Sequence, residues 1–364
     1  MPDKPSTAHR VSRLRALLRR SGAEAFLILD LKNIRYLTGF SGSDGALLVG
    51  AGKPVLLVDG RYTTQAAKEA PGARVVLYGD KAAGIADALS AGGYGKAGFE
   101  PSVMTVDFLG ALKRKAKKVR WMPLPAESGT LRAVKDSSEI AHIRKAIRIA
   151  TGALQSTLAA IRPGVCELDV AVELEYAMRK KGAEGPSFDT IIASGPNSAL
   201  PHARPGRRKI RAGDFLVVDY GAVSGGYHSD ETCTFVIGRA GKRHEKLYAL
   251  VKEAHDRALE AVRPGVLCRD VDAAARTVID QAGYGPRFSH GTGHGLGLDV
   301  HEAPRLSALS EAVLEEGMVI TIEPGIYLPG DIGVRSEVNV YWSAEGPVVT
   351  PAEIQREIFF FLDD

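Results

Sequence analysis

The chain has 364 residues, of which 45% are hydrophobic and 25% are charged, and its formal net charge is +4. This length suits two domains with apolar cores, and the composition is that of a soluble globular protein. The densest basic run, KRKAKKVR over residues 113–120, has no aromatic residues interleaved for base stacking. We interpret it as the solvated face of a helix and expect no nucleic-acid partner.

The cysteines and the apolar runs indicate the compartment. Cys166, Cys233 and Cys268 are odd in number, widely spaced and form no CxxC motif. This pattern argues against a disulfide framework and against a thiolate metal site. No apolar run reaches the length of a transmembrane helix. We therefore expect a cytoplasmic protein without a membrane partner.

The first third of the chain alternates helix and strand patterns. VSRLRALLRR, which starts at residue 11, predicts an amphipathic basic helix. The residues expected to pack it on its domain are Val11, Leu14, Leu17 and Leu18. Short buried strands are predicted at AFLIL, GALLV, PVLLVD, ARVVLY and KAGFE. This alternation predicts a compact α/β domain over residues 1–125.

A break in periodicity separates this domain from the rest of the chain. PLPAESGTLRAVKD combines prolines with small residues, which predicts a linker over residues 126–136. Ser137 or Ser138 is predicted to cap the long helix that follows.

The chain beyond the linker repeats itself. AIRPGVCELDV over residues 160–170 is echoed by AVRPGVLCRDV over residues 261–271. GPSF at Gly185 is then matched by GPRF at Gly285. Landmarks that hold register to within one residue over this distance predict a duplicated structural unit.

Each copy continues into two strand patterns that carry carboxylates. DFLVVDYGA carries Asp219, and GGYHSDETCTFVIG carries Asp230. In the second copy, GMVITIEPGI carries Glu323 and IGVRSEVNVYW carries Glu337. We expect the four carboxylates to converge if the two halves pack about a pseudo-two-fold axis. Taken alone, Asp219 or Glu323 is also interpretable as a turn or helix-cap residue, since each lies close to a glycine.

The run HGTGHGLGLDVHE holds three histidines, His290, His294 and His301. Its glycines argue against a helix, because each is about 1 kcal/mol less favourable there than alanine. This excludes the helical zinc motif with two histidines on one face. Glycine in an extended segment allows close approach of another backbone or a ligand.

Four buried carboxylates require compensating charge, since like charges at short range raise one another's pKa. Two divalent cations would balance them, and His294 would add a nitrogen ligand. Oxygen ligands with one imidazole and no thiolate suit Mn²⁺ or Co²⁺, and Zn²⁺ also fits. Two such ions about 3.5–4 Å apart share a bridging water and polarise a carbonyl. The expected chemistry is hydrolysis.

The ordered set LVVDYGA, SDETCTF, HGTGHGLGLDVHE, ITIEPGIY and VRSEVNV resembles the pita-bread metallopeptidases, in particular the proline-directed branch of aminopeptidase P and prolidase. RYLTGFSGSDGALLV and VDGRYTTQA resemble the N-terminal domain of bacterial Xaa-Pro peptidases. The resemblance implies an α+β protein: an α/β domain like that of creatinase, the linker, and a pita-bread catalytic domain with pseudo-two-fold duplication over residues 137–364. It also implies a homodimer.

The same resemblance implies a role for each acidic residue in binding two divalent metal ions per subunit. Asp230 and Glu337 match the pair that bridges the two ions, and Asp219 completes the first ion. His294 and Glu323 complete the second. Glu323 would also take up the proton when the bridging water attacks.

Four further residues match positions that contact the substrate. His202, in PHARP, matches a substrate-contacting histidine, and His301 matches the histidine that supports the scissile carbonyl. His290 matches a residue that lines the pocket for the proline ring. Arg305 matches an arginine that binds the free carboxylate of a dipeptide in some small prolidases. Without the resemblance, a surface or turn residue is the better interpretation of His202, and an exposed loop arginine is the alternative for Arg305.

Two more residues, Arg335 and Tyr327, are assigned to the substrate-binding site beside the metal ions. Arg335 is expected to pair with Asp230 and hold the bridging geometry, with an exposed strand arginine as the alternative. Tyr327 is expected to hydrogen-bond near the site or simply to pack. The chain departs from the family at Cys233, where arginine is common, and at Val338, where an acidic residue or asparagine is common. Both changes affect the surroundings of the ligands and leave the ligands in place.

The resemblance predicts an exopeptidase that hydrolyses the N-terminal Xaa-Pro bond of proline-containing peptides, of the Xaa-Pro aminopeptidase type. The alternative is a prolidase restricted to Xaa-Pro dipeptides. Methionine aminopeptidases usually lack the large N-terminal domain and the PHARP motif. Creatinase-like hydrolases and pita-bread binding modules without catalysis are expected to lack the ligand set, which is complete in this chain.

Overall fold

The structure is a computed structural model that describes residues 7–124, 127–343, 346–350 and 361–362. It divides into two compact units, residues 1–132 and 133–364. The predicted boundary at residues 125 and 126 lies outside the described residues, and the linker over residues 126–136 stays a prediction. Part of that segment is helical, since α6 spans Glu127–Ala133.

The first unit is built on a six-stranded mixed sheet in the order β4-β3-β2-β1-β5-β6. Its strands are β1 (Ala25–Ile28), β2 (Ala46–Val49), β3 (Val55–Val58), β4 (Arg74–Leu77), β5 (Lys96–Phe99) and β6 (Arg120–Pro123). The helices that precede α6 are α1 (Thr7–Ser21), α2 (Leu31–Thr38), α3 (Thr63–Glu69), α4 (Lys81–Ala91) and α5 (Val106–Lys115), with a 3-10 turn η1 (Gly60–Tyr62). Every residue of β1, β2 and β3 is buried, as continuous apolar runs predict for central strands.

Two local predictions in this unit need adjustment. Val11, Leu14 and Leu18 of α1 are buried, whereas Leu17 is only half-buried at the edge of the helix's apolar face. The basic run over residues 113–120 is exposed at its charged positions, but α5 ends at Lys115 and Arg120 opens the strand β6. Parallel pairing with β5 makes residues 120–123 a strand.

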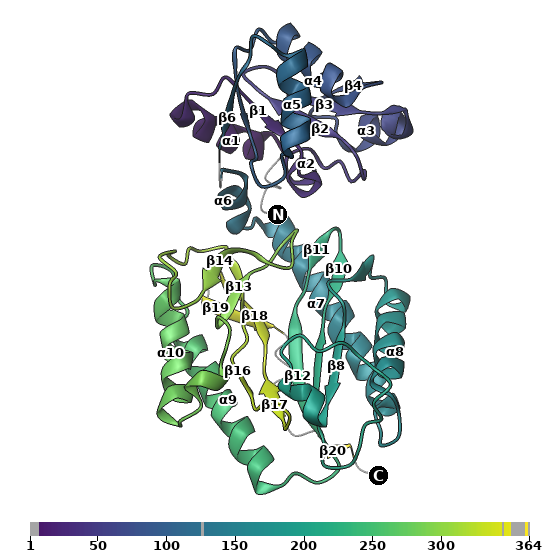
Figure 1. Cartoon of the computed structure of the whole chain (residues 1–364), viewed down its shortest axis with the longest axis vertical. Helices are drawn as coiled ribbons and strands as arrows, with labels where there is room; N and C mark the ends of the chain where they lie inside the picture. The colour runs from purple at the N-terminus through teal and green to yellow at the C-terminus, as the bar shows by residue number, and fades with distance from the viewer. Residues whose placement is uncertain (1–6, 125–126, 344–345, 351–360, 363–364) are drawn as a thin grey trace. The chain divides into compact units, whose positions relative to one another are not determined.

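The second unit consists of two halves with similar elements (Figure 1). The first half contains α7 (Ser137–Thr157), η2 (Leu158–Ala160), α8 (Glu167–Lys180), β7 (Gly185–Pro186), β8 (Ile191–Ser194), η3 (Gly195–Ala199), β9 (Phe215–Tyr220), β10 (Ala222–Ser224), β11 (Tyr227–His228) and β12 (Glu231–Ile237). The second contains α9 (Lys242–Ala261), α10 (Cys268–Gln281), η4 (Gly285–Arg287), β13 (Gly293–Gly295), β14 (Glu302–Leu306), β15 (Val319–Ile322), β16 (Gly325–Tyr327), β17 (Gly333–Arg335), β18 (Val338–Ser343) and β19 (Gly346–Thr350). A short strand β20 (Phe361–Leu362) pairs with β12.

The strands of each half form a sheet that a pair of helices covers. The sheet orders are β20-β12-β9-β8 and β14-β13-β15-β18-β19, with smaller sheets β11-β10-β7 and β16-β17. Leu174 of α8 packs in one core with Val218 of β9. Val271 of α10 packs in a second core with Ile322 of β15. Figure 1 shows α7 and α8 beside the first sheet and α9 and α10 beside the second.

The duplication appears in matching backbone hydrogen bonds. Gly164 N donates to Ile210 O at 2.9 Å, and Gly265 N donates to Leu314 O at 2.8 Å. Each glycine follows the proline of an RPG turn. The second unit therefore has the internal duplication expected of the predicted pita-bread domain, and it follows the N-terminal α/β domain in the sequence.

The cap of α7 differs from the prediction. Asp136, rather than Ser137 or Ser138, is the N-cap residue, and its carboxylate accepts the backbone N–H groups of Ser138 and Glu139. Glu139 Oε2 accepts the N–H of Asp136 at 3.0 Å in return. This reciprocal capping box satisfies more terminal N–H groups than a serine cap alone would.

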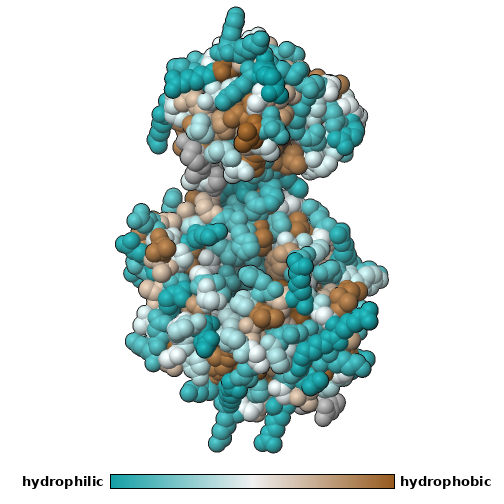
Figure 2. All heavy atoms as spheres, in the orientation of Figure 1, coloured by the Kyte–Doolittle hydropathy of each residue, from teal (hydrophilic) through white to brown (hydrophobic). Residues whose placement is uncertain are grey.

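None of the helices in the described ranges combines the length and apolar character that crossing a membrane requires. The molecular face in Figure 2 is mostly hydrophilic, with hydrophobic residues scattered over it.

Candidate metal centre and substrate cavity

Strand pairing gathers three of the carboxylates around Thr232 of β12. Thr232 lies opposite Asp219 of β9 and forms an isolated antiparallel bridge with Glu337, which directly precedes β18. Asp230 directly precedes β12. Because cross-strand neighbours lie about 5 Å apart, this register brings acidic residues from both halves together.

The second half contributes His294 and Glu323 from neighbouring strands. His294 is the central residue of β13, and Glu323 directly follows β15. The two segments are joined by a hydrogen bond from Glu323 N to Thr292 O at 2.8 Å. A Cβ atom on Gly293 would lie 1.9 Å from Thr321 O, so a side chain there would prevent this approach. The glycines around His294 thus allow β13 to pack closely against its neighbours.

The ring of His294 is oriented by its own backbone. Its Nδ1 lies 3.0 Å from Gly295 O, and because a carbonyl only accepts, Nδ1 carries the proton. The Nε2 lone pair then faces Asp230 Oδ2 at 3.6 Å and Glu323 Oε1 at 3.5 Å. Ligand atoms of Asp230, His294 and Glu337 all lie within 4.8 Å of one another. A metal-ligating histidine typically has one ring nitrogen free for the ion and the other hydrogen-bonded, as Nε2 and Nδ1 of His294 are here.

The buried carboxylates around His294 can all be ionised only if positive charge is added nearby. Burial and the neighbouring carboxylates raise the pKa of Asp230 and Glu337 well above the usual range. Burial raises the pKa of Glu323 to about 7. Burial lowers the pKa of His294 to about 4, so its ring is neutral near pH 7. Several carboxylates beside a neutral imidazole form a donor set that fits divalent cations.

Asp219 differs from the other carboxylates in its partner. Its Oδ2 accepts a hydrogen bond from Arg335 Nη2, whereas its Oδ1 is buried without a hydrogen-bond partner in the described part of the chain. The prediction that Arg335 pairs with Asp230 is therefore wrong. The register places the Arg335 guanidinium at Asp219 and Thr232, since its Nε donates to Thr232 Oγ1 at 3.0 Å.

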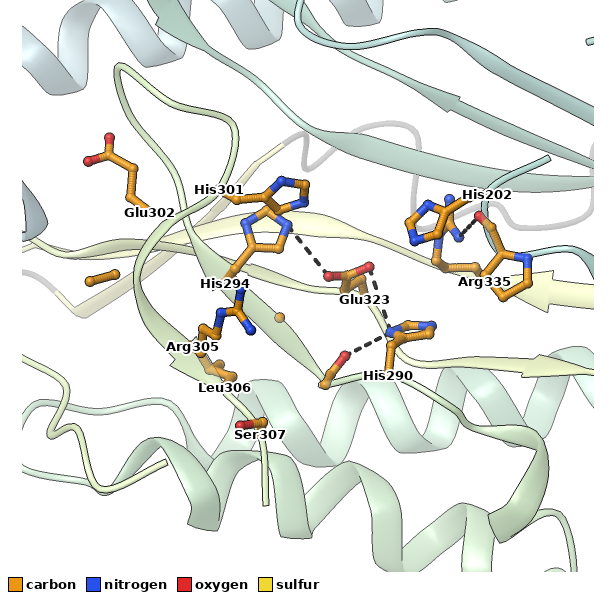
Figure 3. Close-up of a pocket in the computed structure, with 14 residues that line it drawn as sticks. His202, His290, His294, His301, Glu302, Arg305, Leu306, Ser307, Glu323 and Arg335 are labelled. Carbon is orange, nitrogen blue, oxygen red and sulfur yellow. Dashed lines mark hydrogen bonds and ion pairs between the residues drawn. The ribbon is translucent and has the colours of Figure 1, made fainter. Parts of the chain in front are cut away.

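Two adjoining cavities open beside the cluster. One of about 580 Å³ is lined by histidines and loop residues of the second half, including His290, Arg305 and Ser307 (Figure 3). The other, of about 320 Å³, is lined by metal-site carboxylates and by Phe188 and Ile191. Residues that line both cavities are His202, His294, His301, Glu323 and Arg335. All five predicted metal ligands line the smaller cavity, and two of them, His294 and Glu323, also line the larger one.

Three predicted histidines, His202, His290 and His301, line the cavities outside the metal cluster. His301 is exposed, and its ring lies 4.3 Å from that of His294, edge to face. Partial desolvation of its ring at the cavity and the nearby His202 lower the pKa of His301. Figure 3 shows His202 close to Arg335, across the cavity from Arg305. The structure therefore places hydrogen-bonding groups on opposite sides of Glu323.

Tyr327 lies behind His290 and completes a hydrogen-bond chain. Arg335 Nη1 donates to Tyr327 OH at 3.1 Å, and Tyr327 OH lies 2.9 Å from His290 Nε2. His290 Nδ1 donates to Gly291 O at 2.8 Å, so Nε2 accepts from the tyrosine. The chain fixes the orientation of the His290 ring at the cavity wall.

Several residues at the site were not identified from the sequence. The cavity walls include Phe188, Asp189, Ile191 and Arg204, all from the first half. Phe188 belongs to the GPSF landmark, which was used only as evidence for the repeat. Arg204 belongs to the PHARP motif, in which only His202 was assigned a role, and Asp189 lies in no motif that was singled out.

Comparison with known proteins gives consistent matches over both units. Residues 141–344 match metallopeptidase family M24, and residues 10–134 match the creatinase/prolidase N-terminal domain. The chain is 37% identical to a Xaa-Pro dipeptidase of Pyrococcus horikoshii over 93% of this chain and 95% of that protein. The structure of a Xaa-Pro dipeptidase from Bacillus anthracis is similar with a TM-score of 0.94 at 37% identity, covering 98% of this chain and 100% of that one. An X-Pro aminopeptidase from Thermotoga maritima has a TM-score of 0.86 at 35% identity, covering 93% and 96%.

Proposed function

Because the chain belongs to metallopeptidase family M24, we propose that it is a Xaa-Pro dipeptidase that hydrolyses the bond before proline. The observation that carries this proposal is the meeting of Asp230, His294 and Glu337 within 4.8 Å beside a cavity lined by further histidines and Arg305. The aminopeptidase type, which was the main prediction from the sequence, becomes the second candidate. The dipeptidases among the relatives favour this order.

The proposed metal site uses five residues. Asp230 and Glu337 would bridge two divalent ions, Asp219 would complete the first, and His294 and Glu323 the second. The unpartnered Oδ1 of Asp219 and the free Nε2 lone pair of His294 support this assignment. Mn²⁺ or Co²⁺ suits these ligands, and Zn²⁺ also fits. When bound, such ions lower the pKa of a water molecule and polarise a carbonyl oxygen.

The protein's own groups would then move the proton and support the carbonyl. Glu323, which lines both cavities, would take up the proton of the attacking water as a general base. His301 and His202 would donate hydrogen bonds to the carbonyl oxygen as it gains negative charge. Both are placed at the shared wall of the two cavities.

Specificity for proline has a chemical reason. The bond before proline is a tertiary amide without an N–H, so peptidases that bind that donor handle it poorly. His290 is proposed to pack on the proline ring, in an orientation held by Tyr327. Arg305, which is exposed to the larger cavity, is proposed to bind the free carboxylate of a dipeptide. We further propose that the enzyme acts in the cytoplasm as a homodimer on proline-containing peptides.

The test compares Ala-Pro with Ala-Pro-Ala for the wild type, Arg305→Ala and Arg287→Ala. Arg287 is an exposed arginine of the same half that does not line the cavity, so it serves as the matched control. A dipeptidase should prefer Ala-Pro. Arg305→Ala should then raise KM for Ala-Pro by about tenfold or more, because a charge-assisted hydrogen bond contributes about 1.5–3 kcal/mol.

The aminopeptidase candidate makes the opposite prediction. In that case the wild type cleaves Ala-Pro-Ala at least as well as Ala-Pro, and Arg305→Ala changes both substrates equally. Failure of the metal-loaded wild type to cleave either peptide would contradict the proposed function as a whole.

A further inference from the structure

Helix α10 carries an ion pair that faces the backbone of the site. Arg276 Nε donates to Asp272 Oδ2 at 2.9 Å, and Arg276 Nη2 donates to Asp272 Oδ1 at 2.9 Å. Asp272 is fully buried, with 0% exposure. A buried carboxylate needs such a bidentate partner, and the fork of an arginine provides it.

The other two hydrogen bonds described for Arg276 go to one segment of the backbone. Nη1 donates to Phe288 O at 3.1 Å, and Nη2 also donates to His290 O at 2.7 Å. The guanidinium carbon lies 4.3 Å from the centre of the Phe288 ring. The arginine thus holds two alternate carbonyls of the chain that leads to His294.

Asp272 holds the next alternate residue of the same segment. Its Oδ1 accepts the backbone N–H of Thr292 at 3.0 Å and the Thr292 hydroxyl at 2.9 Å. Thr292 O in turn accepts the N–H of Glu323 at 2.8 Å. One ion pair therefore connects α10 to His290 and to Thr292, which lies two positions before His294. Thr292 extends the connection to Glu323.

The hydrogen bonds from Asp272 and Arg276 support a segment that has no regular secondary structure. Residues 288–292 belong to no helix or strand, and the ladder of β13 begins only at Gly293. The side chains of Asp272 and Arg276 supply hydrogen-bond partners that a strand would otherwise provide. Without them the segment would gain freedom directly beside two site histidines.

We propose that Asp272 and Arg276 form a positioning pair that sets where His290 and His294 stand relative to Glu323. The inference rests on the proposed function for its catalytic consequence, but the placement of His294 is testable by metal binding alone. The pair touches neither substrate nor metal. Its effect passes through the backbone of residues 288–292.

The main test uses Arg276→Lys, which keeps a positive charge beside Asp272. A lysine ammonium lacks the planar fork and cannot reach the carboxylate and both carbonyls together. We expect the dissociation constant for Co²⁺, measured by calorimetry and by the visible absorption of bound Co²⁺, to rise about 10–100-fold. We also expect KM for Ala-Pro to rise, because His290, which lines the larger cavity, is displaced.

A second variant keeps the ion pair and removes one contact. Thr292→Val deletes only the hydroxyl donor to Asp272 and should weaken Co²⁺ binding by about fivefold, as expected for one hydrogen bond. It decides the matter if Arg276→Lys does not fold. The matched control is Lys252→Met, which breaks the exposed i,i+4 pair with Asp256 on α9 and should leave Co²⁺ binding unchanged.

A purely structural role predicts a different result. It would lower the melting temperature and the fraction of active protein, while the Co²⁺ dissociation constant and KM stay at their wild-type values. That result in the folded variants would overturn the proposal. If the wild type binds Co²⁺ but hydrolyses no Xaa-Pro peptide, the proposed function fails while the Co²⁺ titrations still decide whether the pair positions His294.

Discussion

The guanidinium of Arg335 is bonded to the carboxylate of Asp219 in the buried wall between the two halves. Arg335 also donates to Thr232 Oγ1, Pro201 O and Tyr327 OH. Its guanidinium therefore connects the predicted metal ligand Asp219 with Thr232 of β12 and, through Tyr327, with His290 at the cavity wall. Its removal should therefore affect stability as well as the site.

Arg335→Met in chelated protein should lower the free energy of unfolding by about 3–5 kcal/mol, because a buried carboxylate is left without its partner. The control is Arg243→Met, whose pair with Asp331 is 57% and 43% exposed. Exposed pairs contribute about 0–1 kcal/mol. Urea unfolding of the three proteins measures the difference. Equal losses in the two variants would contradict the structural role given to Arg335.

Glu323→Gln should reduce turnover of Ala-Pro by about 10²–10⁴-fold, because the amide cannot accept the proton and is a poorer metal ligand. The change conserves size, so the melting temperature of the variant should remain close to that of the wild type. Glu311→Gln, at an exposed position outside the cavities, is the control. Wild-type turnover in Glu323→Gln would exclude the glutamate as the proton acceptor.

Chelation should make the stability of the protein depend on pH. The pKa of Asp230 and Glu337 is raised well above the usual range by burial and mutual repulsion, so the folded chelated state retains protons that the unfolded chain has lost. Folded-state stability from a raised carboxyl pKa is present at low pH and is lost as pH rises through the folded pKa. The histidines oppose this trend only at lower pH, because burial lowers the pKa of His290 and His294 to about 4.

The informative window lies around pH 7, the raised folded-state pKa of Glu323, where unfolded carboxylates are ionised and unfolded histidines are largely neutral. The melting temperature of chelated protein should fall across this window, while that of protein saturated with Mn²⁺ should change less. Ligand binding at a hundredfold excess over the dissociation constant adds about 2.7 kcal/mol. Parallel pH profiles with and without metal, or turnover that survives thorough chelation, would contradict the proposed metal site.

Tyr327→Phe should raise KM for Ala-Pro about fivefold with little change in kcat, because one hydrogen bond of about 1 kcal/mol no longer holds the His290 ring. Steady-state kinetics separate the two parameters. Tyr341→Phe, on β18 and away from the substrate cavities, is the control. A fall in kcat at constant KM would instead assign Tyr327 to the chemical step.

Local patterns predicted the elements whose burial is uniform. The strands β1, β2 and β3 are continuous apolar runs, and each lies within a segment predicted from the sequence. The strand β6 was missed because Arg120, Trp121, Met122 and Pro123 show no such run and pair only with β5. The cap of α7 was placed one or two residues late, at Ser137 or Ser138, since the reciprocal bond between Asp136 and Glu139 outweighs a serine hydroxyl.

The sequence by itself determined the kinds of groups available for chemistry and their order along two related halves. This was possible because strand periodicity, glycine content and the repeated RPG turn are local properties, which can be recognised in the sequence without knowledge of the fold. The tertiary structure alone decided that Arg335 reaches Asp219 rather than Asp230, and that Asp272 and Arg276 hold the segment before His294. These pairings depend on the register and packing between elements far apart in the chain, which no single stretch of sequence encodes.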